Sequence, residues 1–296
     1  MIKLLRDFRP EIIQVEEEPW SLSLLEFALI GKIFGAKIVF FTWENLFRIH
    51  QPWYALIEKI NLKLADEAIA GNREAKEILK RRGFLKEITL LPQLGVDPKV
   101  FKKDSQDDLK KKLGLRSFVI GSFARLEEQK GIRTIFEAFQ KIKDQNVSLL
   151  LVGSGPMLAE IQQLTAVDPR ILAPGVVNHA QMPAYFNLLD VFVLASLTTP
   201  VWKEQFGHVL IEAMAAGVPL LGSSSGAIPE VVGDAGLVFK EKDVQDLQEK
   251  LERLISDKKL WQELSKKGLA RVEQNYTQEK IANKTWEIYQ NLLEDK

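Results

Sequence analysis

The residue types best suited to chemistry are gathered in one segment, 203–219, which reads KEQFGHVLIEAMAAGVP. Glu204 comes just before the first turn of a predicted helix over 207–216, on the same side as His208 and Glu212, which lie four residues apart and share one face. The start of this helix offers backbone N–H groups and a positive dipole end to an anion. Carboxylates accept hydrogen bonds from vicinal diols in pairs, so the segment suits a ligand with both phosphate groups and sugar hydroxyls.

The rest of the segment explains why it folds as a helix and where it stops. Gly217 followed by Pro219 ends the helix. A single glutamate on a surface helix is usually a solvated side chain, and it is the whole segment that favours a site. The face opposite His208 and Glu212 carries an apolar stripe of Val209, Leu210, Ala213 and Met214. The backbone N–H groups expected to bind an anion belong to Phe206, Gly207, His208 and Val209.

Two cations, Arg125 and Lys130, follow a predicted strand over 117–123. Loops at the carboxyl ends of parallel strands are where α/β folds bind ligands. An arginine fork and a lysine point charge five residues apart can clamp a diphosphate, although such a pair taken alone is more often surface charge. Gly153 opens a glycine-rich turn after the strand 147–152, which permits close backbone approach but is common in such folds.

Short apolar runs alternate with longer stretches of helical period, which predicts βαβ units and parallel sheets, an α/β fold. The second half holds enough strands for a complete doubly wound sheet. Its predicted strands are 117–123, 147–152, 170–173, 190–194, 218–222 and 236–239, and its predicted helices are 131–143, 156–166, 180–188, 207–216, 227–232, 243–256, 258–273 and 277–293.

The first half shows four strand candidates: 11–15, 37–42, 67–70 and 87–91. Residues 1–8 resemble the tail of a helix that leads into the first of them. A doubly wound domain normally opens with a strand and a ligand-approaching turn, so we expect this domain to be incomplete, roughly two to three βα units short. The alternative is a small native four-stranded domain.

Composition sets limits on partners. Apolar residues make up 46% and charged residues 27% of the 296 residues, which is typical of a well-cored globular protein. Forty basic residues balance forty acidic ones, so no global field favours nucleic acid. The chain has no cysteine and its three histidines show no metal-ligand spacing, so no metal site is expected. We expect a cytoplasmic protein, since no signal peptide or membrane span is evident.

The domain boundary is expected near 97–105, where Gly95-Val96-Asp97-Pro98 precedes a solvated charged stretch over 102–112. This divides the chain into an N-terminal domain over 1–100, a C-terminal domain over 101–275 and a helix over 276–296 that packs back on the first domain.

Together these residues resemble the retaining family-4 (group 1) glycosyltransferases, which have the GT-B fold of two Rossmann-like domains facing a cleft. The most specific match is Glu204 to Glu212, a Glu, seven residues, Glu pattern, followed by AMAAGVP. The resemblance also includes the Arg125/Lys130-Gly131 loop, the turn VGSGP over 152–156 and DVFVLAS over 190–196. The N-terminal half matches more loosely, through NREA at 72–75 and LPQLGVD at 91–97.

The resemblance implies a metal-independent transfer of a hexose from a nucleotide-diphosphate sugar to a glycan or lipid acceptor, without a cofactor or an enzyme nucleophile. Arg125 and Lys130 would hold the diphosphate and stabilise the leaving group, while Glu212 would bind the ribose. Glu204 would grip the donor sugar with backbone groups of Phe206, Gly207 and His208, and Val177 would line the base pocket.

This chain departs from the family in its first half. Most members carry a His or acidic residue after an N-domain strand, and Glu44 is the candidate here. The family's opening strand and glycine loop have no counterpart, so we expect a partner that completes the domain, or poor solubility. Two other readings are a sugar-nucleotide epimerase and a donor-binding domain without turnover. The segment 46–64 is expected to be a core helix with a basic face, with peripheral membrane contact at the inner face as the alternative.

Overall fold

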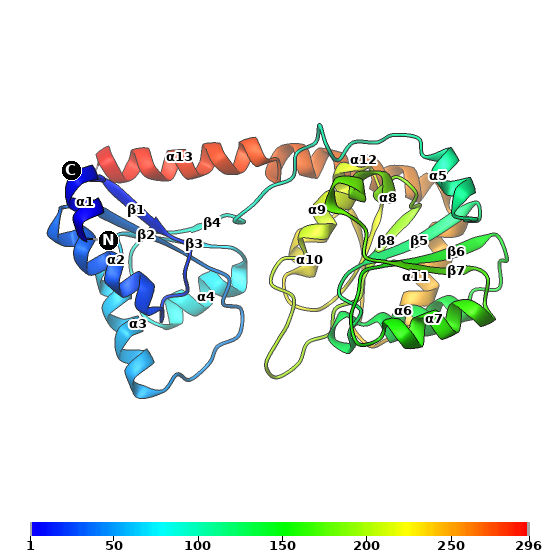
Figure 1. Cartoon of the computed structure of the whole chain (residues 1–296), viewed down its shortest axis with the longest axis horizontal. Helices are drawn as coiled ribbons and strands as arrows, with labels where there is room; N and C mark the ends of the chain where they lie inside the picture. The colour runs from blue at the N-terminus through cyan, green and yellow to red at the C-terminus, as the bar shows by residue number, and fades with distance from the viewer. Residues whose placement is uncertain (1, 295–296) are drawn as a thin grey trace. The chain divides into compact units, whose positions relative to one another are not determined.

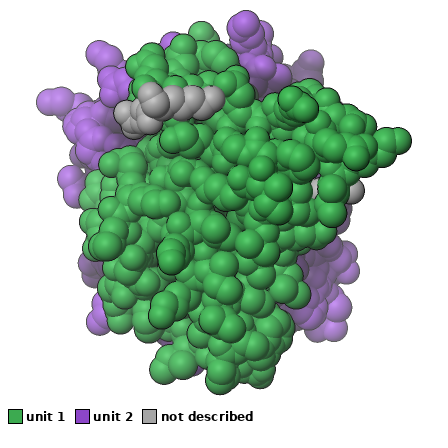
Figure 2. Space-filling model, turned by 90° about the vertical axis from the view of Figure 1, so that its left-hand side faces the viewer, with its two compact units in different colours: residues 1–95, 278–296 green, residues 96–277 purple. Residues whose placement is uncertain are grey.

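The computed structural model describes residues 2–294, and the chain divides into two compact units (Figure 1). The first consists of Met1–Gly95 and Gln278–Lys296, and the second of Val96–Thr277; Figure 2 colours them separately. The chain therefore leaves the first unit once and returns to it for its last helix.

In the described part of the chain, the first unit is built on a four-stranded parallel sheet of order β1-β2-β3-β4. Its strands are β1 (Ile12–Val15), β2 (Lys37–Thr42), β3 (Glu67–Ala70) and β4 (Ile88–Leu90). Successive side chains of β2 point to opposite faces of the sheet. Ile38 and Phe40 join the core on one face, and Val39 and Phe41 join the core on the other.

Helices cover both faces of this sheet. The core around Ile38 and Phe40 is completed by α1 (Ile2–Phe8), α2 (Leu22–Ile33), α3 (Pro52–Leu64) and α4 (Arg73–Arg81). The opposite face is covered by α13 (Gln278–Glu294), whose Ile281, Ile288 and Leu292 pack against Val39, Phe41 and Ile69. The last helix of the chain is thus part of the first unit's core.

The second unit, within the residues described, holds a six-stranded parallel sheet of order β10-β9-β8-β5-β6-β7. Its strands are β5 (Phe118–Phe123), β6 (Val147–Val152), β7 (Ile171–Gly175), β8 (Val191–Leu194), β9 (Leu220–Ser223) and β10 (Gly236–Phe239). Both β6 and β8 are fully buried, as the apolar runs at 149–152 and 191–194 predict. The order reverses at β5, so β5 and its neighbour β8 mark the switch point of a doubly wound sheet.

The helices of this unit alternate with the strands. They are α5 (Asp107–Lys112), η1 (Glu128–Lys130), α6 (Ile132–Lys141), α7 (Leu158–Val167), η2 (His179–Gln181), α8 (Met182–Phe186), α9 (His208–Ala215), α10 (Ile228–Val232), α11 (Val244–Ser256) and α12 (Lys258–Asn275). One core packs α6, α7 and α11 against the sheet, and a second contact joins rings of Phe123, Phe186 and Phe192.

The α/β fold and all ten predicted strands are confirmed, with each end placed to within two residues. One expectation is wrong in part: the charged stretch 102–112 is a helix, α5, from Asp107 onward. Asp107 and Asp108 lie in its first turn and Lys110 to Lys112 in its last, so the charges favour the helix dipole. Among the helices that the structure describes, none is long and apolar enough to span a bilayer.

Candidate functional site

The carboxylate of Glu204 is the centre of a polar cluster in the second unit. Its Oε2 accepts hydrogen bonds from Lys130 Nζ at 2.7 Å and from Ser196 Oγ at 2.7 Å, and Glu204 is buried. The ammonium of Lys130 also lies 4.5 Å from the ring centroid of Trp202. The sequence predicted Glu204 and Lys130 but missed Ser196 and Trp202. Lys130 lies 74 residues from Glu204, so only the fold brings the pair together.

Glycines fix the backbone that carries these two residues. Gly131, directly after Lys130, has a φ of 65°, and a Cβ there would lie 2.0 Å from the carbonyl oxygen of Ala195. The loop after β5 is therefore pressed against the end of β8. Gly226 has a φ of 51°, and a Cβ there would lie 2.0 Å from the carbonyl oxygen of Glu204. A larger residue does not fit at either glycine, so these two close contacts fix the backbone that carries Lys130 and Glu204.

Helix α9 begins directly after this cluster. Gly207 precedes it with a φ of 78° and, having no side chain, places no capping acceptor over the first turn. His208 Nδ1 lies 3.4 Å from Glu212 Oε1, so these two residues share a face as their spacing predicts. Glu212 is only 7% exposed, and the helix is buried over most of its surface. A helix start, an imidazole and a carboxylate are thus presented side by side.

Arg125 is placed differently from Lys130. Its side chain is 73% exposed, and its Nη2 lies 2.5 Å from Glu127 Oε2. The hydrogen bond from Arg125 lowers the pKa of Glu127, which also accepts from Gln129 Nε2 at 2.6 Å. The two predicted cations therefore hold separate acidic partners in this structure, Glu127 for Arg125 and Glu204 for Lys130.

The turn after β6 packs against the loop after β5. Gly153 has a φ of 142°, and a Cβ there would lie 1.9 Å from the carbonyl oxygen of Ala124. Its N–H donates to the carbonyl of Gly175, the last residue of β7, at 2.9 Å. Val177 follows two residues later and is half-buried. The carboxyl ends of β5, β6 and β7 are thus joined at one edge of the sheet, where open α/β folds bind ligands.

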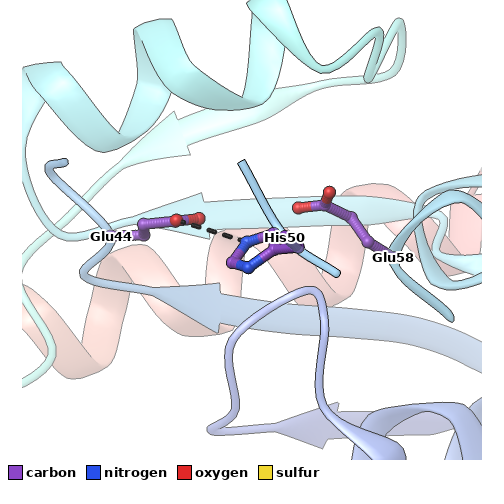
Figure 3. A group of neighbouring side chains, drawn as sticks. All are labelled: Glu44, His50 and Glu58. Carbon is purple, nitrogen blue, oxygen red and sulfur yellow. Dashed lines mark ion pairs between the residues drawn. The ribbon is translucent and has the colours of Figure 1, made fainter. Parts of the chain in front are cut away.

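In the first unit, Glu44 lies in an ion-pair network. Its Oε1 is 3.6 Å from His50 Nε2 (Figure 3). The same Oε1 is 2.9 Å from Arg82 Nη2, and Arg82 Nη1 lies 2.6 Å from Glu58 Oε2. The Glu44 side chain is 9% exposed, and burial raises its pKa to about 7 although Arg82 opposes the shift. Contact between Glu44 and a donor sugar stays a prediction.

The same network brings metal-ligand atoms together in a way that the sequence spacing did not indicate. One ligand atom each from Glu44, His50 and Glu58 lies within 4.8 Å of the others. They come from the loop after β2 and from α3, and Figure 3 shows Glu44 and Glu58 on either side of His50. The guanidinium of Arg82 already supplies positive charge to both carboxylates, so this cluster carries its own cation.

Comparison with known protein families gives one match over more than half of the chain. The model described as "Glycosyl transferases group 1" matches residues 105–271. The capsular polysaccharide biosynthesis glycosyltransferase CapM of Staphylococcus aureus is 30% identical over 256 residues, covering 81% of this chain and 65% of CapM. The chain spans about half to two thirds of the length of the curated relatives that it matches.

Solved structures show the same fold. Anabaena HepE in complex with UDP superposes with a TM-score of 0.80 at 20% identity, covering 98% of this chain and 80% of HepE. The C-terminal domain of the group 1 protein LpcC from Francisella tularensis gives a TM-score of 0.54 at 27% identity, covering 62% of this chain and 99% of that domain. The two parallel α/β sheets of this chain are thus those of the GT-B fold.

Proposed function

The chain belongs to the group 1 glycosyltransferases, and from that premise we propose that it moves a hexose from a nucleotide-diphosphate sugar to an acceptor. The observation that carries the proposal is the buried Glu204, held by Lys130 and Ser196 immediately before the start of α9. A carboxylate suits sugar hydroxyls, and a lysine with a helix N-terminus suits phosphate oxygens. In this proposal the carboxylate binds the sugar of the donor, and the lysine and the helix start bind its diphosphate.

Other residues of the second unit contact the remaining parts of the donor in this proposal. Lys130 and Arg125 neutralise the charge that develops on the leaving diphosphate, with the start of α9 adding its dipole. Glu212 accepts hydrogen bonds from the ribose, and Val177 contacts the base. Backbone groups of Phe206, Gly207, His208 and Val209 complete the sugar site. Protein cations then replace a divalent metal, and the transfer retains the anomeric configuration without an enzyme nucleophile.

The comparisons support the choice of ligand class. HepE was solved with UDP, and CapM is named for capsular polysaccharide biosynthesis. We therefore propose a nucleoside-diphosphate hexose as donor and a glycan or lipid-linked glycan as acceptor.

Calorimetry with UDP- and GDP-hexoses, followed by a donor-hydrolysis and transfer assay, tests the proposal. Glu204→Gln should keep nucleotide binding and lower turnover roughly 100-fold, since it removes the negative charge of a side chain that contacts the reacting sugar in this proposal. Turnover should survive chelator treatment, and the product should show a retained anomer by NMR. Binding without hydrolysis or transfer would favour a donor-binding protein.

Glu137→Gln is the matched control, because Glu137 is exposed on α6 and loses the same charge. It should leave turnover unchanged. If Glu212→Ala and Arg125→Ala both leave nucleotide binding intact, the site is wrongly assigned.

A further inference from the structure

A band of exposed apolar side chains follows the loop after β2 and continues along α3. Phe47 is 46% exposed, Ile49 95%, Trp53 47% and Leu56 59%. Basic side chains lie among them, and all are exposed. We call this surface the α3 face, and it consists of Phe47, Arg48, Ile49, Trp53, Leu56, Lys59 and Lys63.

The spacing of these residues places them on the outer side of α3. Ile57 and Leu62 of the same helix are buried, and Leu62 is part of the first unit's core. Trp53, Leu56 and Lys63 fall on the other side, at intervals close to whole helical turns. The helix is therefore amphipathic in an unusual way, since its outer side begins apolar and ends basic.

The loop that precedes α3 is held in place. Arg82 Nη2 donates to the carbonyl oxygen of Arg48 at 3.2 Å, and the guanidinium of Arg81 lies 4.1 Å from the ring centroid of Phe47. Arg82 is itself fixed by Glu58. The exposed tip of the loop, with Ile49, is thus presented on a structured base.

The charge of this region is one-sided. Between residues 45 and 65 the only acidic residue is Glu58, which is buried and bonded to Arg82. Arg48, Lys59 and Lys63 are exposed. A surface that is apolar and positive therefore lies on a chain whose net charge is zero.

We infer that the α3 face binds the surface of a lipid bilayer that contains anionic lipids. Tryptophan and aliphatic side chains enter the headgroup region, while lysine and arginine contact the lipid phosphates. A twofold contact between two copies fits less well, because it sets the same basic residues against each other. The inference does not depend on the proposed glycosyl transfer, since no donor is needed for binding.

Co-sedimentation of the full chain with vesicles tests this inference. Binding is expected to vesicles of phosphatidylcholine mixed with phosphatidylglycerol, to be much weaker with phosphatidylcholine alone, and to fall as salt is raised. Each basic residue near an anionic surface contributes about fivefold in partitioning, so Lys59→Gln with Lys63→Gln should weaken binding roughly 25-fold. Trp53→Gln with Leu56→Gln should weaken it by about tenfold or more.

Lys111→Gln with Lys112→Gln is the charge-matched control, because both lysines are exposed on α5 of the second unit. It should leave vesicle binding unchanged, and Val167→Gln, an exposed apolar residue elsewhere, should do the same. Unchanged melting temperatures of all variants show that binding, not folding, is altered. The inference would be overturned if the Lys59/Lys63 variant and the Lys111/Lys112 variant bound vesicles equally well, or if the wild-type chain bound neither kind of vesicle. It would also be overturned if the wild-type chain formed a dimer that the substitutions on the α3 face converted to a monomer.

Discussion

Arg125 Nη2 lies 2.5 Å from Glu127 Oε2, so the diphosphate that we propose for this guanidinium would compete with a carboxylate. Glu127→Gln removes the competing charge and should raise affinity for a nucleoside diphosphate. The gain should reach at most about fivefold, because exposed ion pairs contribute only ~1 kcal/mol or less. Calorimetry with UDP and GDP measures it.

Glu128→Gln provides the control for this prediction. Glu128 is one residue away and pairs instead with Arg133, an exposed residue on α6. The two variants lose the same charge in the same loop. Equal affinities for Glu127→Gln and Glu128→Gln would show that Glu127 does not regulate Arg125.

Burial raises the pKa of Glu44 from its ordinary 4.5 to about 7. A carboxyl with a raised pKa in the folded chain is stabilised when protonated, so its contribution is complete below pH 4.5 and is lost as pH rises through about 7. The loss is on the order of 3 kcal/mol, at 1.36 kcal/mol per pKa unit. The charged groups facing it are Arg82, Glu18, Glu58, Arg48 and His50.

Glu44→Gln should therefore flatten the fall in melting temperature of the first unit between pH 5 and 8, as measured by scanning calorimetry. Some slope should remain, since burial also raises the pKa of Glu18 and of Glu58. Glu26→Gln, at an exposed position on α2, should keep the full slope. A variant at Glu44 with the wild-type slope would contradict the assignment.

Local spacing in the sequence predicts contacts within one element, but it does not predict contacts between residues far apart in the chain. His208 and Glu212 are one helical turn apart, so their contact follows from the helix alone. Ser196 and Glu204 lie in the same loop between β8 and α9, whereas Lys130 follows β5, so the hydrogen bond from Lys130 to Glu204 depends on β5 and β8 being neighbours at the switch point. Periodicity does not encode which strands are neighbours.

At the scale of elements, the turn between η1 and α6 positions Lys130. Gly131→Ala would force an alanine to a φ of 65° with its Cβ 2.0 Å from Ala195 O. We expect a loss of more than about 1 kcal/mol in stability and weaker nucleotide binding, because relief of the clash displaces Lys130. Melting temperature and calorimetry measure the two effects.

Gly114→Ala separates backbone strain from the clash. Gly114 also has a φ of 65°, but no atom lies within 4 Å of its ideal Cβ. It should cost stability without weakening nucleotide binding. Nucleotide binding lost equally in both variants would argue against a special role for the turn at Gly131.

Strands were predictable and the short charged helix was not. Buried parallel strands such as β8, and residues 149–152 of β6, are continuous apolar runs, so they stand out in the sequence. Helix α5 has no buried residue and depends on charges that complement its dipole. An apolar pattern cannot reveal an element that buries nothing. For α3 the sequence favoured a core helix and left membrane contact as the alternative, because apolar residues such as Trp53 and Leu56 are usually buried; the structure exposes both side chains.

At the scale of the whole molecule, the first unit is built from two stretches of chain that are far apart in the sequence. Residues 278–294 return to the first unit, where α13 supplies one face of the core. Residues 96–277 form the second unit without that helix and contain Arg125, Lys130, Glu204 and Glu212. The proposed donor residues therefore belong to one continuous stretch of chain, so nucleotide binding by the second unit can be tested apart from turnover.

A protein consisting of residues 96–277 should fold and bind UDP or GDP with an affinity within about threefold of the full chain, since its core and its site are contained within it. The corresponding C-terminal domain of LpcC was crystallised. Transfer to an acceptor should be lost, because the first unit is absent. Calorimetry and a transfer assay on the same sample measure both. If this protein shows a cooperative melting transition but no nucleotide binding, the first unit must supply binding residues, and the assignment of the donor site to the second unit is wrong.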